Sequence, residues 1–317
     1  MPRVTTTFLR AAILEVILVA LCAVLAVAAP RFLTVDNLLN VLRNVSMQGL
    51  IALGMTMVII AGEIDLSVGS MVAFAGCLTA YVTGALSGIG IEVAIASAIL
   101  ITVAAGAMLG IFSGWMRTRY RVPTFITTLA LMTALTGAAE LITNGFPLTP
   151  FPSWYNFIGG GYVLGVPFPA IVFLAAFGAV LVVMNHTGFG RSVYAVGGNA
   201  EAARLSGIDV ARVKITALAV TSGLAALSGV MQSSEIMSGT ATTAKGWELD
   251  VIAAVIIGGT SLMGGVGRVW GTMVGVIFLG VIINGMTLLN ISEYWQHVVR
   301  GALILAAVLI NRLQQRG

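Results

Sequence analysis

The stretch that decides the fold is Ile95–Ile111, which reads IASAILITVAAGAMLGI and contains no charged side chain. A helix needs about 20 mainly apolar residues to cross the hydrocarbon core of a bilayer, and apolar residues on both sides extend this run to that length. A second run, Ala11–Ala29, reads AAILEVILVALCAVLAVAA. Neither run alternates between apolar and polar residues, and Glu15 is the one charged residue in the two, so both predict membrane-spanning helices.

The composition of the whole chain agrees with these two runs. Of 317 residues, 58% are apolar and 9% are charged, and the mean hydropathy is +1.03. Soluble domains carry about 25% charged residues, and disordered chains combine low hydrophobicity with high charge. Both classes are therefore excluded. We expect an all-α polytopic membrane protein with one transmembrane domain over residues 1–317.

Apolar segments along the chain predict about ten crossings. The first, 11–29, is interpreted as an uncleaved helix, although Ala26-Val27-Ala28 resembles a signal-peptidase site. Two segments, 62–65 and 258–267, could be broken or re-entrant. The other nine spans are expected near 47–62, 66–84, 91–114, 124–143, 166–184, 213–232, 250–266, 269–288 and 294–311.

The basic residues predict the orientation, because cytoplasmic loops are enriched in Lys and Arg. Ten crossings place both termini and the interval 185–212 in the cytoplasm, and the uncharged interval 144–166 outside. No basic cluster with interleaved aromatic residues indicates nucleic-acid binding. The basic residues that fall on the cytoplasmic side are Arg3, Arg10, Arg117, Arg119, Arg121, Arg191, Arg204, Arg212, Lys214, Arg268, Arg312 and Arg316.

Signatures of catalysis and of metal binding are missing from the sequence. It contains no Gly-x-Ser-x-Gly and no phosphate-binding Gly-x-x-x-x-Gly-Lys loop. Cys22 and Cys77 lie inside apolar runs and are interpreted as core residues, while His186 and His297 are far apart. We therefore expect no enzyme activity, no metal and no cofactor in this chain, so any ATP hydrolysis would occur on a partner.

Glycines recur every fourth residue in two segments. Small residues at this spacing allow membrane helices to approach closely, and substrate lining is the alternative interpretation. The two series are Gly106, Gly110 and Gly114, and Gly267, Gly271 and Gly275.

The acidic residues in the apolar part of the chain fall at predicted helix ends. Asp65 precedes a predicted helix and is expected either to cap it or to act in gating or substrate contact. The triplet Glu63-Ile64-Asp65 resembles Glu248-Leu249-Asp250, a faint internal repeat. The candidate gating or capping residues are Glu63, Asp65, Ser67, Glu248 and Asp250.

The interval 185–212 contains the signature of a short cytoplasmic helix. Asn199 suits the N-cap, Glu201 the first turn and Gly207 a left-handed position after the last turn. A helix over Ala200–Ser206 is too short to be stable alone. It must dock either on a partner or on the protein's own helix ends.

This interval also carries a specific resemblance. Tyr194–Ile208 resembles the cytoplasmic loop of ribose-type carbohydrate ABC importer permeases, and three further regions agree with that family in the same order. Glu63 departs from it, because the family commonly has glycine there. The further regions are Gly54–Ile59 with Ile64–Ser70, Pro123–Leu129, and Glu248–Asp250 through Gly258–Ser261 to Gly264-Gly265.

The resemblance implies a permease of the bacterial inner membrane that imports a pentose or similar sugar. It implies pairing with a second permease copy or a homologous permease, delivery by a periplasmic sugar-binding protein, and an ABC ATPase subunit docked on the short helix. The coupling residues would be Asn199, Ala200, Glu201, Ala202, Ala203, Arg204, Leu205, Ser206 and Gly207.

Two further expectations concern mechanism. An ion-coupled secondary transporter or channel is the alternative, and the lack of midspan carboxylates argues against it. Phe125, Thr128 and Asn284 are candidate residues of the substrate path, with plain packing as the alternative for each. Arg204 is expected to reach a carboxylate on the ATPase, and Leu205 to anchor the short helix.

Overall fold

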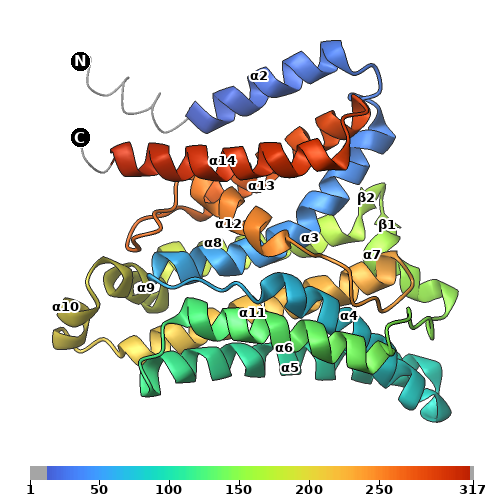
Figure 1. Ribbon diagram of the computed structural model, residues 1–317, viewed down its shortest axis with the longest axis horizontal. Helices are drawn as coiled ribbons and strands as arrows, with labels where there is room; N and C mark the ends of the chain where they lie inside the picture. Colours follow the sequence, from blue (N-terminus) through green and yellow to red (C-terminus); the bar gives the residue numbers. More distant parts are fainter. Residues whose placement is uncertain (1–12, 315–317) are drawn as a thin grey trace.

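The computed structural model describes residues 13–314, without the side chains of 307–308 and 310–314, and this part of the chain is mainly helical (Figure 1). Within the described residues, the bundle consists of ten helices: α2 (Ile13–Ala28), α3 (Val35–Ile60), α4 (Val68–Ala85), α5 (Ile91–Arg119), α6 (Thr124–Thr143), α8 (Phe168–His186), α11 (Val210–Glu235), α12 (Trp247–Ile257), α13 (Val269–Leu288) and α14 (Glu293–Gln314). Short elements connect them: η1 (Ser87–Ile89), η2 (Ser153–Asn156), α7 (Phe157–Gly160), the antiparallel pair β1 (Tyr162–Val163) and β2 (Val166–Pro167), α9 (Gly188–Gly198) and α10 (Ala200–Leu205).

Seven helices in the described range are long and apolar enough to cross a membrane: α3, α4, α5, α6, α8, α11 and α13. The all-α polytopic class is therefore confirmed, whereas ten crossings remain a prediction. Helix α2 has 16 residues and α12 has 11, and 11 residues rise only about 16 Å. Arg3, Arg10 and Arg316 lie outside the described residues, as does the side chain of Arg312.

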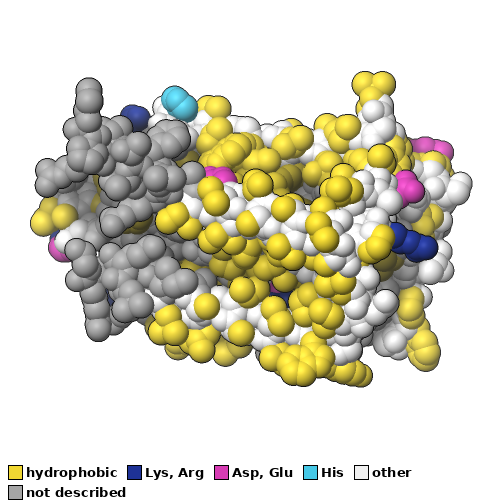
Figure 2. Space-filling view, turned by 90° about the horizontal axis from the view of Figure 1, so that it is seen from above, with side chains coloured by type: hydrophobic (Ala, Val, Ile, Leu, Met, Phe, Trp, Pro, Cys, Tyr) yellow, Lys and Arg dark blue, Asp and Glu magenta, His cyan; other side chains and the backbone are white. Residues whose placement is uncertain are grey.

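The bundle has two distinct ends (Figure 1). Helices α9 and α10 and the turn between α5 and α6 lie at one, which we call the α10 end. The pair β1–β2 and α7 lie at the other, the hairpin end. The face in Figure 2 is apolar over its middle, and most of its visible charged atoms lie toward the two ends. Exposed side chains such as Leu100 (72%) and Leu141 (79%) fit a surface that lipid covers.

The glycine series pack helices closely, as predicted. A Cβ atom on Gly110 would lie 2.3 Å from the carbonyl oxygen of Leu218, so α5 and α11 meet at backbone distance. In the second series, a Cβ on Gly271 would lie 1.9 Å from the Gly258 carbonyl oxygen, and α13 thereby packs on the end of α12. Close approach supplies the van der Waals contact that holds helices together in lipid.

Two helices begin in the middle of the bundle. Residues 61–67 return from the α10 end into the interior before α4 starts, and the linker 236–246 runs inward from the hairpin end before α12 starts (Figure 1). The two starts meet, because a Cβ atom on Gly69 of α4 would lie 2.1 Å from Oε2 of Glu248 in α12. The segments suspected of breaks are thus non-helical, at 61–67 and at 258–268.

Candidate functional site

The segment between α3 and α4 is held by a buried aspartate. Asp65 is 0% exposed, and its Oδ1 accepts hydrogen bonds from the backbone N–H of Ser67 (2.8 Å) and from the Ser67 hydroxyl (2.6 Å). Ser222 of α11 donates to Oδ2 at 3.4 Å. All three donors are neutral. Asp65 therefore holds the turn before α4 through hydrogen bonds and not through an ion pair. Ser67 is the N-cap residue, but its own side chain makes no capping bond.

Thr128, a candidate path residue, contacts the same segment. Its hydroxyl accepts a hydrogen bond from the backbone N–H of Leu66 at 3.1 Å, and it is fully buried. This bond ties α6 to the segment before α4, a positioning role. Phe125, one turn earlier on α6, is 51% exposed and lines a cavity of about 250 Å³ beside Glu63.

Glu63 is the centre of a buried charge cluster near the α10 end. Its Oε1 accepts from Arg117 Nε (2.7 Å) and Lys214 Nζ (2.5 Å), and its Oε2 accepts from the Thr124 hydroxyl (2.5 Å). These partners belong to α5, α11 and α6, so one carboxylate joins three helices to the segment 61–67. Two cations on one buried anion make the cluster depend on the charge of Glu63.

Asp250, in the first turn of α12, forms a second buried ion pair. It is 2% exposed, and its Oδ1 lies 2.7 Å from Nε of Arg300 in α14. Glu248, two residues earlier in the same turn, packs on the start of α4. The two acidic triplets of the sequence repeat therefore hold the starts of α4 and α12. Arg300 was not among the residues selected from the sequence.

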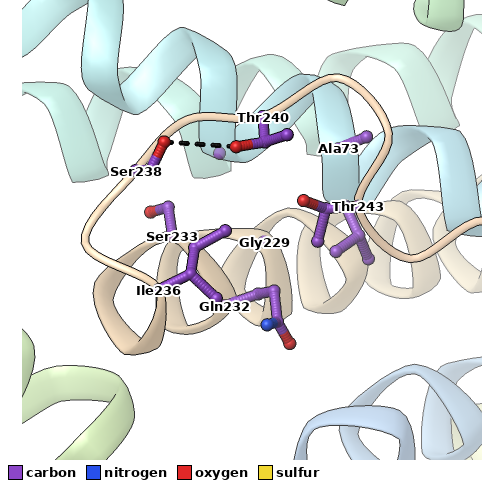
Figure 3. Close-up of a pocket in the computed structure, with 10 residues that line it drawn as sticks. Ala73, Gly229, Gln232, Ser233, Ile236, Ser238, Thr240 and Thr243 are labelled. Atoms are coloured by element: carbon purple, nitrogen blue, oxygen red, sulfur yellow. Dashed lines mark hydrogen bonds between the residues drawn. The ribbon is translucent and has the colours of Figure 1, made fainter. Parts of the chain in front are cut away.

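A closed cleft between α4 and α11 lies under the linker 236–246 (Figure 3). Its polar lining is neutral and comes from Gln232, Ser233, Ser238, Thr240 and Thr243, with Ser238 and Thr240 hydrogen-bonded at 3.1 Å. The cleft leaves no room for a water molecule. Sequence reasoning missed it, although the hydroxyl-rich stretch SSEIMSGTATTA (233–244) is a visible signal.

The linker over this cleft contains unusual backbone conformations. Met237 (φ 54°) and Ala244 (φ 58°) are left-handed although neither is glycine, and Gly246 (φ 88°) follows. Residues other than glycine rarely adopt the left-handed backbone conformation without strain. Such strain often occurs in segments that move in function.

Asn284 lies apart from Phe125 and Thr128. Its side-chain amide exchanges two hydrogen bonds with Asn37, at 2.8 and 3.0 Å. Asn37 is in the first turn of α3, about 35 Å along that helix from Ile60. The structure therefore does not bring the three candidate path residues together.

Helix α10 has the predicted caps. The Asn199 side chain accepts from the backbone N–H groups of Glu201 (3.0 Å) and Ala202 (2.9 Å). Gly207 is left-handed (φ 85°), and the N–H of Ile208 closes the end by donating to Ala203 O at 3.0 Å. The chain therefore forms this helix with its own capping groups.

The side chains of α10 divide between the protein and its surroundings. Ala203 is buried at 4%, so the helix docks partly on its own chain, whereas Leu205 is 75% exposed and leaves an apolar tip outside. Arg204 pairs with Glu201 of its own helix at 2.5 Å, and this pairing holds the pKa of Glu201 below its ordinary value. The same six-residue helix contains Ala200 and Ala202, and Ser206 is its C-cap residue.

Comparison with known proteins gives consistent matches along the chain. Residues 37–308 match the family model described as branched-chain amino acid transport system / permease component. The ribose import permease protein RbsC of Escherichia coli K12 is 40% identical over 302 residues, which cover 94% of this chain and 92% of that protein. RbsC of Bacillus subtilis is 43% identical over 92% and 89% of the two chains, and the L-arabinose ABC transporter permease protein AraH of Azospirillum brasilense is 37% identical over 96% and 88%. No solved structure matches.

Proposed function

Because the chain belongs to the family of branched-chain amino acid transport system / permease components, we propose that it is the membrane-spanning subunit of an ATP-driven (ABC) importer for a pentose or similar small carbohydrate. The observation that carries the choice of cargo is the 40% identity to a ribose import permease over 94% of the chain. The closed cleft has no room for cargo, but its neutral hydroxyl and amide lining would offer a neutral polyol hydrogen-bond partners once the cleft opens.

The proposed arrangement places ten crossings in the bacterial inner membrane, with the α10 end and both termini in the cytoplasm. An ABC ATPase subunit binds α10 and hydrolyses ATP, so this chain is neither an enzyme nor a holder of a cofactor. A periplasmic sugar-binding protein delivers cargo at the hairpin end, and a second copy or a homologous permease completes the pathway. The exposed tip at Leu205 and the basic residues near the α10 end support this orientation.

The starts of α4 and α12 are the proposed moving parts. Both helices begin inside the bundle and are fixed by side chains instead of continuous backbone helix, through Asp65, Glu248 and the Asp250–Arg300 pair. Discontinuous helices of this kind occur at the midplane sites of transporters. Alternation between outward- and inward-open states then requires small displacements of these starts when the ATPase closes.

The test is uptake by the chain reconstituted in liposomes with its ATPase and binding protein. Ribose, arabinose and xylose are compared with leucine, because the family description names branched-chain amino acids. We expect uptake of one pentose that requires ATP and all three proteins. Leucine uptake would contradict the cargo assignment, and uptake driven by an ion gradient without the ATPase would establish the secondary-transporter alternative.

A further inference from the structure

Three separate segments of the chain meet through main-chain atoms at the α10 end. They are the last turn of α9, the end of α3 with the linker 61–67, and the linker 258–268 between α12 and α13. The backbone N–H of Gly265 donates to the carbonyl oxygen of Ile60 at 2.8 Å. Gly197 of α9 lies against both groups, since a Cβ atom built on it would be 1.6 Å from that oxygen and 2.5 Å from the Gly265 nitrogen.

Neighbouring glycines extend this contact. A Cβ on Gly264 would lie 2.8 Å from the Gly197 carbonyl oxygen and 3.1 Å from Cα of Gly62, and one on Gly265 would lie 2.7 Å from Cα of Gly198. Gly264 (φ 82°) and Gly265 (φ 73°) are also left-handed, so their backbone turn favours glycine for a second reason. The Tyr194 hydroxyl of α9 donates to the Gly267 carbonyl oxygen at 3.1 Å.

The position of this contact in the chain is what gives it a role. Asn199, the N-cap of α10, follows Gly197 by two residues. On the other side, the linker 61–67 carries Glu63 and Asp65 and leads into α4, and the linker 258–268 follows α12 directly. One contact therefore connects the short helix to the linkers of both helices that begin inside the bundle.

We propose that Gly197, Gly264 and Gly265 form a glycine junction that transmits displacement of α10 to the start of α4 and to the end of α12. These three residues are positioning residues for transport, and the proposal rests on the function proposed above. Main-chain atoms in direct contact suit this task because they have no rotamers that could absorb a small movement, and packed protein interiors transmit strain. A junction of long side chains at this place would yield under the same displacement.

Gly197 and Gly198 provide a matched pair for the test. A Cβ on Gly198 would meet nothing within 4 Å, and neither residue has a left-handed backbone. Gly198→Ala should therefore leave ATP-driven uptake within about twofold of the unmodified protein, whereas Gly197→Ala forces α9 away from Ile60 and should lower uptake by about tenfold or more. Both variants should still copurify with the ATPase, because α10 and its caps are unchanged.

A second readout follows the linker itself. Ile64 lines the 250 Å³ cavity beside Glu63, so Ile64→Cys in a background of Cys22→Ala and Cys77→Ala reports access to that linker by maleimide labelling in nanodiscs. With the ATPase bound, a non-hydrolysable ATP analogue should change the labelling rate in the unmodified protein and in Gly198→Ala, and the change should be lost in Gly197→Ala.

If Gly197→Ala does not accumulate in the membrane, Tyr194→Phe is used to test the junction. It removes one hydrogen bond to the linker 258–268 and no packing, so it should weaken the nucleotide-dependent change at normal yield. If Gly197→Ala shows the same nucleotide-dependent change in labelling as the unmodified protein, the proposed junction is wrong. The same result in Tyr194→Phe has this meaning if Gly197→Ala cannot be obtained. If the unmodified protein neither binds an ATPase nor takes up sugar with ATP, the proposed function has failed instead, and the two failures are distinguishable.

Discussion

Two buried carboxylates, five and three residues before the start of α4 at Val68, differ in what neutralises them. Asp65 accepts hydrogen bonds from neutral groups of Ser67 and Ser222, whereas Glu63 accepts from the cations Arg117 and Lys214. A neutral amide can replace the first carboxylate, since its oxygen still accepts. It cannot replace the second, because the buried Lys214 and the partly exposed Arg117 would both remain without their anion.

The same chemical change should therefore have opposite outcomes at the two positions. Asp65→Asn is expected to keep the thermal unfolding midpoint of the detergent-purified protein, while Asp65→Ala costs about 0.5–2 kcal/mol, the range for losing a helix-capping oxygen. Glu63→Gln should cost more, about 3–5 kcal/mol, the range for breaking a buried ion pair from one side. If Asp65→Asn destabilised the protein as much as Glu63→Gln, a charge on Asp65 would be required and the capping account would be wrong.

Sequence reasoning found one partner in each of these contacts and missed the other. Glu63 and Asp250 stand out because they are rare charges in an apolar chain. Lys214 is 151 residues from Glu63, and nothing local to Lys214, Arg117 or Arg300 indicates which acid each will meet. Helix packing decides these pairs, so they become visible only in three dimensions.

Among the elements, the short helix α10 depends on a small number of contacts. It has six residues, and its stability comes from the Asn199 cap, the left-handed Gly207 and the burial of Ala203. Space around Gly207 is open, since an added Cβ would meet nothing within 4 Å. A substitution there consequently acts through backbone strain alone.

This makes Gly207 a clean test of the element. Gly207→Val should destabilise the end of α10 by roughly 1–2 kcal/mol, because a β-branched residue is strained at positive φ, and ATP-driven uptake by the reconstituted complex should fall. Gly207→Asn, which tolerates this conformation, should retain most of the uptake. Both variants should insert normally. Equal uptake by Val and Asn variants would show that transport does not depend on the conformation of this helix end.

Most long elements could be predicted from apolar runs, and the exceptions have physical causes. The expected spans 124–143 and 269–288 coincide with α6 and α13. Helix α3 begins at Val35 instead of 47. Its first turns carry polar residues, such as Asn37 and Arg43, which interrupt the apolar run in the sequence but find partners inside the protein. Helix α12 ends at Ile257, since the glycine-rich stretch after it turns against Ile60 and α9 instead of continuing to 266.

At the scale of the whole molecule, the distribution of basic residues between the two ends predicts the orientation. The basic residues Arg117, Arg191 and Arg212 belong to α5, α9 and α11 near the α10 end, while the hairpin end carries the uncharged interval 144–166 (Figure 1). The positive-inside rule then predicts that the α10 end is cytoplasmic. An ATPase in the cytoplasm can bind α10 only if this end of the bundle is on the cytoplasmic side.

Reporter fusions test the orientation directly. Alkaline phosphatase fused after Arg121 or Arg191 should be inactive, and the same enzyme fused within 144–166 should be active, because it folds only outside the cytoplasm. A green fluorescent protein at the same three sites should give the complementary pattern. An active phosphatase at Arg191 would place α10 outside and exclude the proposed contact with an ATPase.

The glycine junction has a consequence for how this protein can change over generations. A contact between side chains can be strengthened or weakened in steps, by a methyl group at a time, so selection can adjust it gradually. A contact between main-chain atoms offers no such series, since at Gly197 every other residue brings the same Cβ to the Ile60 carbonyl. Substitutions at Gly197 therefore cannot adjust this contact in small steps. Any tuning of the transport rate in descendants of this chain must be sought in the surrounding residues, such as Tyr194 and Leu205, and the three glycines should persist through substitutions that alter the cargo.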